Sequence, residues 1–217
     1  MLFGAVGDIH GDFDALDRVM TRHPEVAFWV CPGDLASDNG EYRAPRASLY
    51  WIKGNNEDFD FVAAQPAGGG TLPNLYFIPN GIRVQADQFV LAGLGGTHAP
   101  TWYERPASDL RRLSARDDRR RHFVHEEVNA CKALSGVDIF LSHEAPRPFP
   151  LPRAKDAGKT PINEVLSAMR PRLHLFGHHH KYTVAERQQV RSIGLDEVSD
   201  SYLIFDGKTL AHQRLTI

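Results

Sequence analysis

The sequence predicts a layered α/β fold. Apolar runs of strand length alternate with helical patterns, as in "LFGAVGDIHG" (2–11) followed by "DFDALDRVMTRH" (12–23). Several of these runs end in Gly or Ser followed by Asp, Asn or His, which is typical of a buried strand that leads into a polar loop. The 217 residues contain no internal repeat, linker or low-complexity tract, so we expect a single domain over 1–217.

In the first half of the chain, three predicted strands each end in polar residues. After the first strand, Phe13, Leu16, Val19 and Met20 recur at helical spacing, which predicts a helix. The runs "VAFWVCPGD" (26–34) and "SLYWIKGNNE" (48–57) predict two further strands. The stretch "EDFDFVAAQ" (57–65) predicts a helix that ends before Pro66.

The second half changes in character. Turn signals "PNG" and "AD" within 74–96 predict an antiparallel hairpin or meander. A polar stretch at 106–135 is expected to be helical. The runs "VDIFLSHEAP" (137–146) and "PRLHLFGHHH" (171–180) predict two more strands, and "SYLIFDGKTL" (201–210) predicts a terminal hairpin.

Charge and cysteine content narrow the class of protein. A net charge of −2 and a pI of about 6.6 argue against attraction of the whole surface to nucleic acid or anionic membrane. The two cysteines, Cys31 and Cys131, are far apart and do not predict a disulfide framework. The N-terminus lacks the basic region of a signal peptide, and no apolar run reaches the length of a membrane span. We therefore expect a cytoplasmic protein without membrane association.

Polar side chains follow five of the predicted strands. In layered α/β folds the carboxyl ends of strands meet at one edge, where ligands bind. Seven residues would gather there: Asp8, His10, Asp34, Asn55, His143, His178 and His180. Oxygen and nitrogen donors without thiolates suit Mn²⁺, Fe²⁺, Zn²⁺ or Ni²⁺. Seven donors exceed the needs of one such ion and suit two ions that share a carboxylate, a device for hydrolysing phosphate esters.

These motifs resemble an ordered family set. "GDIHG", "GD" at 33–34, "GNNE", "SH" at 142–143 and "GHHH" at 177–180 are similar to the motifs of the calcineurin-like metallophosphoesterases. The resemblance extends from residue 7 to residue 180. It implies a four-layer α-β-β-α sandwich of two mixed sheets, and two divalent metal ions, with Mn²⁺ favoured and Fe, Zn or Ni compatible.

The resemblance also implies a role for each donor. Asp8, His10 and His180 would bind one metal ion. Asn55, His143 and His178 would bind the other, and Asp34 would bridge the two. His179 has no role in the family pattern.

Asn56 departs from that pattern. Most of the family has "GNHD" or "GNHE", in which the histidine stabilises the phosphate and protonates the leaving oxygen. An asparagine donates a hydrogen bond but supplies no proton at pH 7, and general acid catalysis is typically worth about 10²–10⁴-fold. We therefore expect activity on diesters or on esters with acidic leaving groups.

His98 is the candidate for a substitute acid. It lies with Trp102 and Tyr103 in "GLGGTHAPTWYE" (93–104), a Gly-rich turn after a strand. If that loop covers the metal edge, His98 takes the missing role and the aromatic pair stacks on a base. The alternative, a loop histidine without a role, is favoured, because lone histidines occur anywhere.

The segment 104–123 is rich in arginine. It contains Arg105, Arg111, Arg112, Arg116, Arg119, Arg120 and Arg121. One hypothesis is a basic strip that grips a nucleic-acid backbone. The other is an exposed helix with Asp–Arg pairs that docks through Leu110, Leu113, Val124 and Val128, and mixed-sign charge favours it.

Two further interpretations concern function. The stretch "VDIFLSHEAPRP" is similar to RNA lariat debranching enzymes of the same superfamily, which suggests a phosphodiester of nucleotide or nucleic-acid type. The function predicted overall is a binuclear phosphodiesterase in which a metal-bridging hydroxide attacks phosphorus in line and Asn55 and Asn56 orient the phosphate ester. A non-catalytic metal-binding scaffold and a phosphomonoesterase that uses His98 stay open. The apparent retention of all seven donors favours an enzyme, and the sequence does not decide the oligomeric state.

Overall fold

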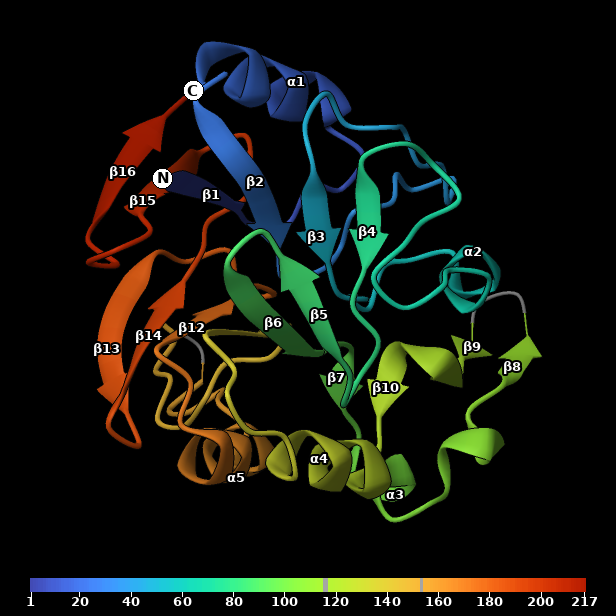
Figure 1. Cartoon of the computed structure of the whole chain (residues 1–217). Helices are drawn as coiled ribbons and strands as arrows, with labels where there is room; N and C mark the ends of the chain where they lie inside the picture. The colour runs from blue at the N-terminus through green and yellow to red at the C-terminus, as the bar shows by residue number, and fades with distance from the viewer. Residues whose placement is uncertain (115–116, 153) are drawn as a thin grey trace.

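The computed structural model describes residues 1–114, 117–152 and 154–217. Within these residues, two six-stranded sheets are stacked and carry helices on their outer faces (Figure 1).

The first sheet combines parallel and antiparallel strands in the order β16-β15-β1-β2-β3-β4. β1 runs parallel to β2, which continues in parallel to β3 and β4, while β15 is antiparallel to both β1 and β16. The strands are β1 (Leu2–Val6), β2 (Val26–Cys31), β3 (Leu49–Trp51), β4 (Leu75–Phe77), β15 (Ser201–Asp206) and β16 (His212–Thr216). The predicted strands and the terminal hairpin are confirmed.

The second sheet is also mixed, in the order β13-β14-β12-β11-β6-β5. Its four central strands are parallel, and the hairpins β5–β6 and β13–β14 form its edges. The strands are β5 (Arg83–Ala86), β6 (Phe89–Leu94), β11 (Ile139–Ser142), β12 (Leu173–Phe176), β13 (Thr183–Arg187) and β14 (Val190–Gly194). The hairpin predicted within 74–96 is confirmed for β5 and β6, whereas β4 belongs to the first sheet.

Helices cover the outer face of each sheet. On the first, α1 (Phe13–Arg22) and α2 (Phe59–Ala63) bury side chains against Trp29 and Trp51. On the second, α4 (His125–Lys132) and α5 (Thr160–Met169) pack against Phe140. The helix predicted at 12–23 and the one at 57–65 are thereby confirmed, the latter as a shorter helix. The arrangement is the expected four-layer α-β-β-α sandwich (Figure 1).

A shared core joins the two sheets. It takes Phe3, Phe28 and Phe205 from the first sheet and Phe89 from the second. The ring of Phe3 stacks on Phe205 with centroids 4.7 Å apart and meets Phe89 at 5.3 Å. Such aromatic packing buries large apolar areas, so the two sheets, and the loops at their strand ends, are held in a fixed relation.

The predicted helix at 106–135 is wrong for most of its length. Among the described residues of that range, α4 is the one α-helix, and the chain from residue 97 up to it forms short elements that include a small hairpin. These elements are β7 (Thr97–His98), α3 (Pro100–Tyr103), the 3₁₀ turns η1 (Ala107–Asp109) and η2 (Arg119–Arg121), β8 (Arg112–Ser114), β9 (Asp117–Asp118) and β10 (His122–Phe123). Arg116 lies outside the described residues.

The sequence explains this outcome. Of the four expected docking residues, Val124 and Val128 are buried near α4, but Leu113 is 48% exposed. The segment before α4 therefore lacks an apolar stripe, and tertiary burial is the main source of helix stability. Two of its Asp–Arg pairs form at a spacing of two residues, Asp117 with Arg119 and Asp118 with Arg120, while Arg105 and Asp109 pair at a spacing of four. The Asp118 side chain also accepts the backbone N–H of Arg120, which favours a turn.

No helix among the described residues has the length and apolar character needed to span a bilayer.

Candidate metal centre

The seven predicted donors lie in loops at the carboxyl ends of strands from both sheets. Asp8 and His10 follow β1, Asp34 follows β2 and Asn55 follows β3. His143 follows β11, and His178 and His180 follow β12. Four of the seven have the left-handed backbone that non-glycine residues seldom adopt, with φ of 47° at His10, 55° at Asp34, 68° at His178 and 46° at His180. Such backbone strain concentrates at functional sites.

Asp8, His10 and His180 form the first group of donors. The Nε2 atom of His180 lies 2.9 Å from Asp8 Oδ2 and 3.3 Å from His10 Nε2. Asp8 is buried, while the side chains of His10 and His180 keep 31% and 38% of their surface exposed. This group therefore lies on the open side of the centre.

The second group is buried more deeply. It contains Asp34, His143 and His178, and His143 has no exposed side-chain surface. His143 Nε2 is 3.0 Å from Asn55 Oδ1 and 3.6 Å from Asp34 Oδ2. Asp34 Oδ2 is also 3.9 Å from His10 Nε2 in the first group. Asp34 thus lies between the two groups, where a shared carboxylate would be.

These separations fit divalent ions. Metal–donor distances of about 2.0–2.2 Å place neighbouring donors about 3.0–3.6 Å apart in tetrahedral or octahedral geometry. Four separations within the two groups, between 2.9 and 3.6 Å, match that range, while His10 Nε2 lies 3.9 Å from Asp8 Oδ2. The donors are carboxylate, amide and imidazole, so the fit is to a borderline cation.

For two of the histidines, the hydrogen bond made by one ring nitrogen fixes which other nitrogen faces the centre. His143 Nδ1–H donates to the carbonyl of Pro32 at 2.8 Å, which leaves Nε2 as the donor atom. His180 Nδ1 lies 2.7 Å from Glu197 Oε1, so its Nε2 faces Asp8. Sequence reasoning missed Glu197, which no motif or strand end marks.

The protonation states also suit ligands. Burial and the neighbouring His143 lower the pKa of His178 to about 3, so its imidazole is neutral at pH 7. Burial acts to raise the pKa of Asp34, but His143, the Asn56 N–H groups and His10 together hold it below its usual value. The hydrogen bond to Asp8 raises the pKa of His180. A cation would therefore compete with a proton at His180.

Glycine is required where the loops after β2 and β3 meet. A Cβ at Gly54 would lie 1.9 Å from Asp34 Oδ1 and 2.4 Å from Asp34 N. Gly33 has φ of +108°, and a Cβ there would meet Gly54 Cα at 2.7 Å and His143 Nδ1 at 2.9 Å. The two glycines allow the backbones to approach closely enough to bring Asp34, Asn55 and His143 together.

Glu57, the last residue of "GNNE", holds these loops. Its carboxylate accepts hydrogen bonds from the backbone N–H groups of Leu35 (3.1 Å), Ala36 (3.3 Å) and Gly54 (3.1 Å). It also accepts the hydroxyl of Tyr42 at 2.6 Å. One carboxylate thereby joins the loop of Asp34 to the loop of Asn55.

The contacts of Asn56 are two hydrogen bonds to the carboxylate of Asp34. Its backbone N–H donates to Asp34 Oδ1 at 2.8 Å, and its side-chain Nδ2 donates to Oδ2 at 2.9 Å. Nδ2 carries two hydrogens, so one remains available to a substrate.

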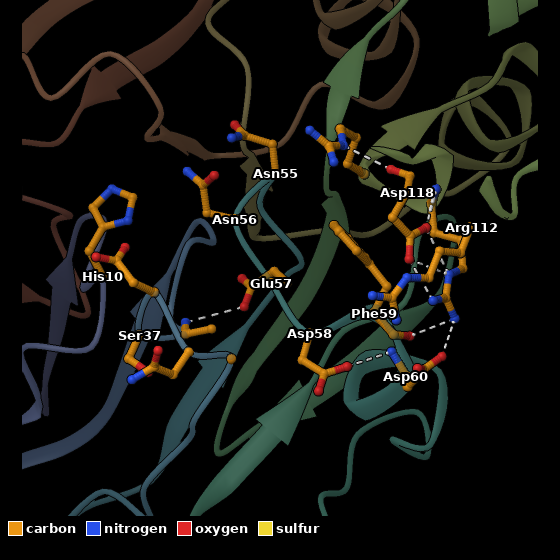
Figure 2. A pocket seen from close by; sticks show the side chains of 16 residues that line it. His10, Ser37, Asn55, Asn56, Glu57, Asp58, Phe59, Asp60, Arg112 and Asp118 are labelled. Atoms are coloured by element: carbon orange, nitrogen blue, oxygen red, sulfur yellow. Dashed lines mark hydrogen bonds and ion pairs between the residues drawn. The ribbon is translucent and has the colours of Figure 1, made fainter. Parts of the chain in front are cut away.

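A cavity of about 570 Å³ opens beside the donors. Its lining includes His10, Asn55 and Asn56 together with Arg112, Asp118, Arg120 and Arg121. Figure 2 shows His10 and Arg112 on opposite sides, with Asn55 and Asn56 between them. The volume is in the range of small-molecule sites.

His98 lies outside the set of described residues that line this cavity. Its ring meets Tyr103 at 4.8 Å and Phe123 at 5.8 Å, and its backbone N–H donates to Glu144 Oε1 at 3.0 Å. Its role as acid stays a prediction.

Trp102, the other candidate of this loop, is covered by the guanidinium groups of Arg105 and Arg119, 4.9 and 5.1 Å from the ring centroid. His179 stacks on Phe149 with centroids 5.0 Å apart.

The two-sheet sandwich and this donor set together define a metal-binding fold of the phosphoesterase class. The sequence model described as calcineurin-like phosphoesterase matches residues 1–182, and the chain belongs to this family.

Individual relatives are distant. The chain is 26% identical over 201 residues to a lariat debranching enzyme from Schizosaccharomyces pombe, an alignment that covers 81% of this chain and 42% of that protein. This chain therefore spans less than half of that relative. A crystal structure of a protein from Thermus thermophilus is similar with a TM-score of 0.68 at 12% identity, covering 99% and 98% of the two chains. The structure of a novel archaeal phosphodiesterase has a TM-score of 0.51 at 11% identity, and the match covers both chains fully. The expected fold and family are confirmed.

Proposed function

We propose that this chain is a binuclear metal-dependent phosphodiesterase. The observation that carries the proposal is the position of Asp34 between two groups of donors, beside a cavity lined by His10 and Asn56. Two divalent ions, with Mn²⁺ favoured and Fe, Zn or Ni compatible, would supply a water of lowered pKa and offset the negative charge of the phosphate. Asp8, His10 and His180 would hold one ion, and Asn55, His143 and His178 the other.

The preference for diesters follows from Asn56. Its second Nδ2 hydrogen can donate to a non-bridging phosphate oxygen while the first orients Asp34. It has no proton to give to a leaving oxygen, so good leaving groups are favoured. The names of two similar proteins, the archaeal phosphodiesterase and the lariat debranching enzyme, agree with a diester substrate.

The test is hydrolysis by protein stripped of metal and reloaded with Mn²⁺. Bis-p-nitrophenyl phosphate and p-nitrophenyl phosphate release the same phenol, so their comparison reports diester against monoester preference. We expect faster turnover of the diester, and a loss of at least about 10²-fold in kcat/KM in Asp34→Asn, as expected when a preorganised charged group is removed. Asp14→Asn, at an exposed site paired with Arg43, is the matched control.

Two other outcomes would overturn the proposal. Faster turnover of the monoester, lost in His98→Ala, would indicate a phosphomonoesterase with His98 as acid. No turnover of either ester, despite stoichiometric binding of two ions, would indicate a metal-binding scaffold.

A further inference from the structure

The arginine-rich hairpin, defined here as β8, β9 and the η2 turn that follows them, lines the cavity beside the candidate metal centre. Of its basic side chains, Arg112, Arg120 and Arg121 line the cavity. The predicted donors His10 and Asn55 line the same cavity, in which His10 lies opposite Arg112 and Asn55 lies between them (Figure 2). At about 570 Å³, the cavity has room for more than one phosphate group.

Lys53 and Arg120 fix this hairpin to the loop of Asn55 and Asn56. Lys53, next to Gly54, donates from Nζ to the carbonyls of Arg120 (2.9 Å) and His122 (3.1 Å). Arg120 Nη1 in turn donates to Asp60 Oδ1 at 2.7 Å, at the start of α2. The spacing between the hairpin and the centre is therefore set by contacts within the protein.

Several charges in the cavity already have internal partners. Arg120 forms ion pairs with Asp118 at 2.6 Å and with Asp60 at 2.7 Å. Asp58 caps α2 by accepting the N–H groups of Asp60 and Phe61. Glu57 is half-buried and accepts four hydrogen bonds.

Two guanidinium groups of the hairpin are oriented by the backbone. Arg112 Nε donates to the Ser114 carbonyl at 3.3 Å, and Arg121 Nε donates to the Asp118 carbonyl at 2.8 Å. Both side chains line the cavity, to which Asp38 adds a negative charge. Arg121 makes a further contact within the protein as well, and a guanidinium carries five N–H donors, so both side chains bring positive charge and donor groups to the lining of the cavity.

We propose that Arg112 and Arg121 bind a second phosphate of the substrate, next to the diester that is cleaved. Guanidinium groups recognise phosphate through paired, charge-assisted hydrogen bonds. A substrate held at both ends would be an oligonucleotide strand rather than an isolated diester, with phosphate contacts that set its register. This inference rests on the proposed function and names the substrate class of that site.

The test compares a thymidine dinucleotide, which has a single internal diester, with the same dinucleotide carrying a 5′-terminal phosphate. With Mn²⁺-loaded wild type we expect the added phosphate to raise kcat/KM by about 10-fold or more, the effect of one hydrogen-bonded charged contact. In Arg112→Ala and Arg121→Ala the ratio of the two kcat/KM values should fall toward one. High salt should reduce the ratio in wild type more than in the variants.

Arg105→Ala is the matched control. Arg105 belongs to the same segment but lies over Trp102 and pairs with Asp109 at 3.8 Å. This variant should keep the ratio of the wild type. Equal kcat/KM for both dinucleotides in wild type, or an unchanged ratio in both arginine variants, would overturn the proposal while the diesterase function stands.

A binding measurement separates this result from failure of the proposed function. Calorimetry with EDTA-treated protein should show a Kd about 5- to 10-fold lower for the phosphorylated dinucleotide, a preference lost in Arg112→Ala. That preference, without hydrolysis of any diester, would support the phosphate site and refute the phosphodiesterase. No preference in binding would refute the phosphate site.

Discussion

Asn56 holds Asp34 through two hydrogen bonds, one from its backbone N–H (2.8 Å) and one from its side-chain amide (2.9 Å). Both oxygens of the Asp34 carboxylate are engaged. The amide thereby orients the carboxylate that lies between the two donor groups. A residue that departs from the family pattern in its acid–base chemistry is suited to a positioning role, because an amide donates at any pH.

Asn56→His should restore a proton donor next to the phosphate. We expect the variant to gain about 10–100-fold on an alkyl leaving group relative to an aryl one, toward the lower end of general acid catalysis. The measurement is the ratio of kcat/KM for a thymidine dinucleotide to that for the p-nitrophenyl ester of thymidine 5′-phosphate.

Asn56→Gln serves as control, because it keeps an amide and adds no acid. Because a displaced Asp34 would lower kcat/KM for both substrates, the ratio of the two values cancels that loss. An unchanged ratio in Asn56→His would mean that position 56 does not reach the leaving oxygen.

Gly54→Ala should disrupt the centre. Its Cβ would lie 1.9 Å from Asp34 Oδ1, so the carboxylate must move. We expect a loss of bound metal and a destabilisation of about 1–3 kcal/mol from overpacking. Metal content by mass spectrometry and urea unfolding in EDTA measure the two effects separately.

Gly136→Ala tests whether a glycine-to-alanine change far from the centre also causes loss of metal. Gly136 has φ of +66°, and the one described atom near its added Cβ is Arg83 Nη1, at 4.0 Å. This variant should lose stability but keep its metal. Full metal content in Gly54→Ala would show that Asp34 is not a ligand.

The elements that could be predicted from the sequence are those specified locally. Strands such as β2 and β11 combine a continuous apolar run with a polar residue at the end, and both signals lie within about ten residues. The same pattern predicts Asp34 and His143 as metal ligands. The spacing of its buried residues predicts the amphipathic helix α1: Phe13, Leu16, Val19 and Met20.

The features that were missed depend on distant contacts. β4 pairs with β3, whereas β5 and β6 pair in the other sheet; strand pairing of this kind is not encoded in turn residues. Glu197 meets His180 only because β14 and β15 bring their connecting loop to the strand ends. The hairpin around Asp118 forms because that segment has no apolar face to bury as a helix.

Glu57→Ala should cost about 2–4 kcal/mol of stability, because it leaves several buried N–H groups without a partner. Tyr42→Phe removes a single donor to the same carboxylate and should cost about 1 kcal/mol. Urea unfolding in EDTA checks both values. A Glu57→Ala variant as stable as wild type would show that the loops of Asp34 and Asn55 are held by other contacts.

His174 should make the protein sensitive to acid. It is fully buried on β12, with Nε2 2.8 Å from Ser142 Oγ and Nδ1 3.0 Å from Ser192 Oγ, and burial lowers its pKa to about 3. The unfolded chain, with a usual histidine pKa near about 6.5, takes up a proton below that pH while the folded protein does not. Stability is therefore lost as pH falls below about 6.5, by at most about 1.4 kcal/mol for each pH unit, until the pH approaches about 3.

His174→Gln keeps a polar group near Ser142 and removes the titration. In EDTA, the free energy of unfolding of wild type should decline between pH 7.5 and pH 5 by about 2 kcal/mol more than that of the variant. If the substitution changed packing alone, the free energy of unfolding would shift by the same amount at every pH, because the difference in proton uptake on unfolding would be that of wild type. Parallel curves would therefore show that His174 is protonated inside the folded protein, and that its two serine contacts rearrange to accept the charge.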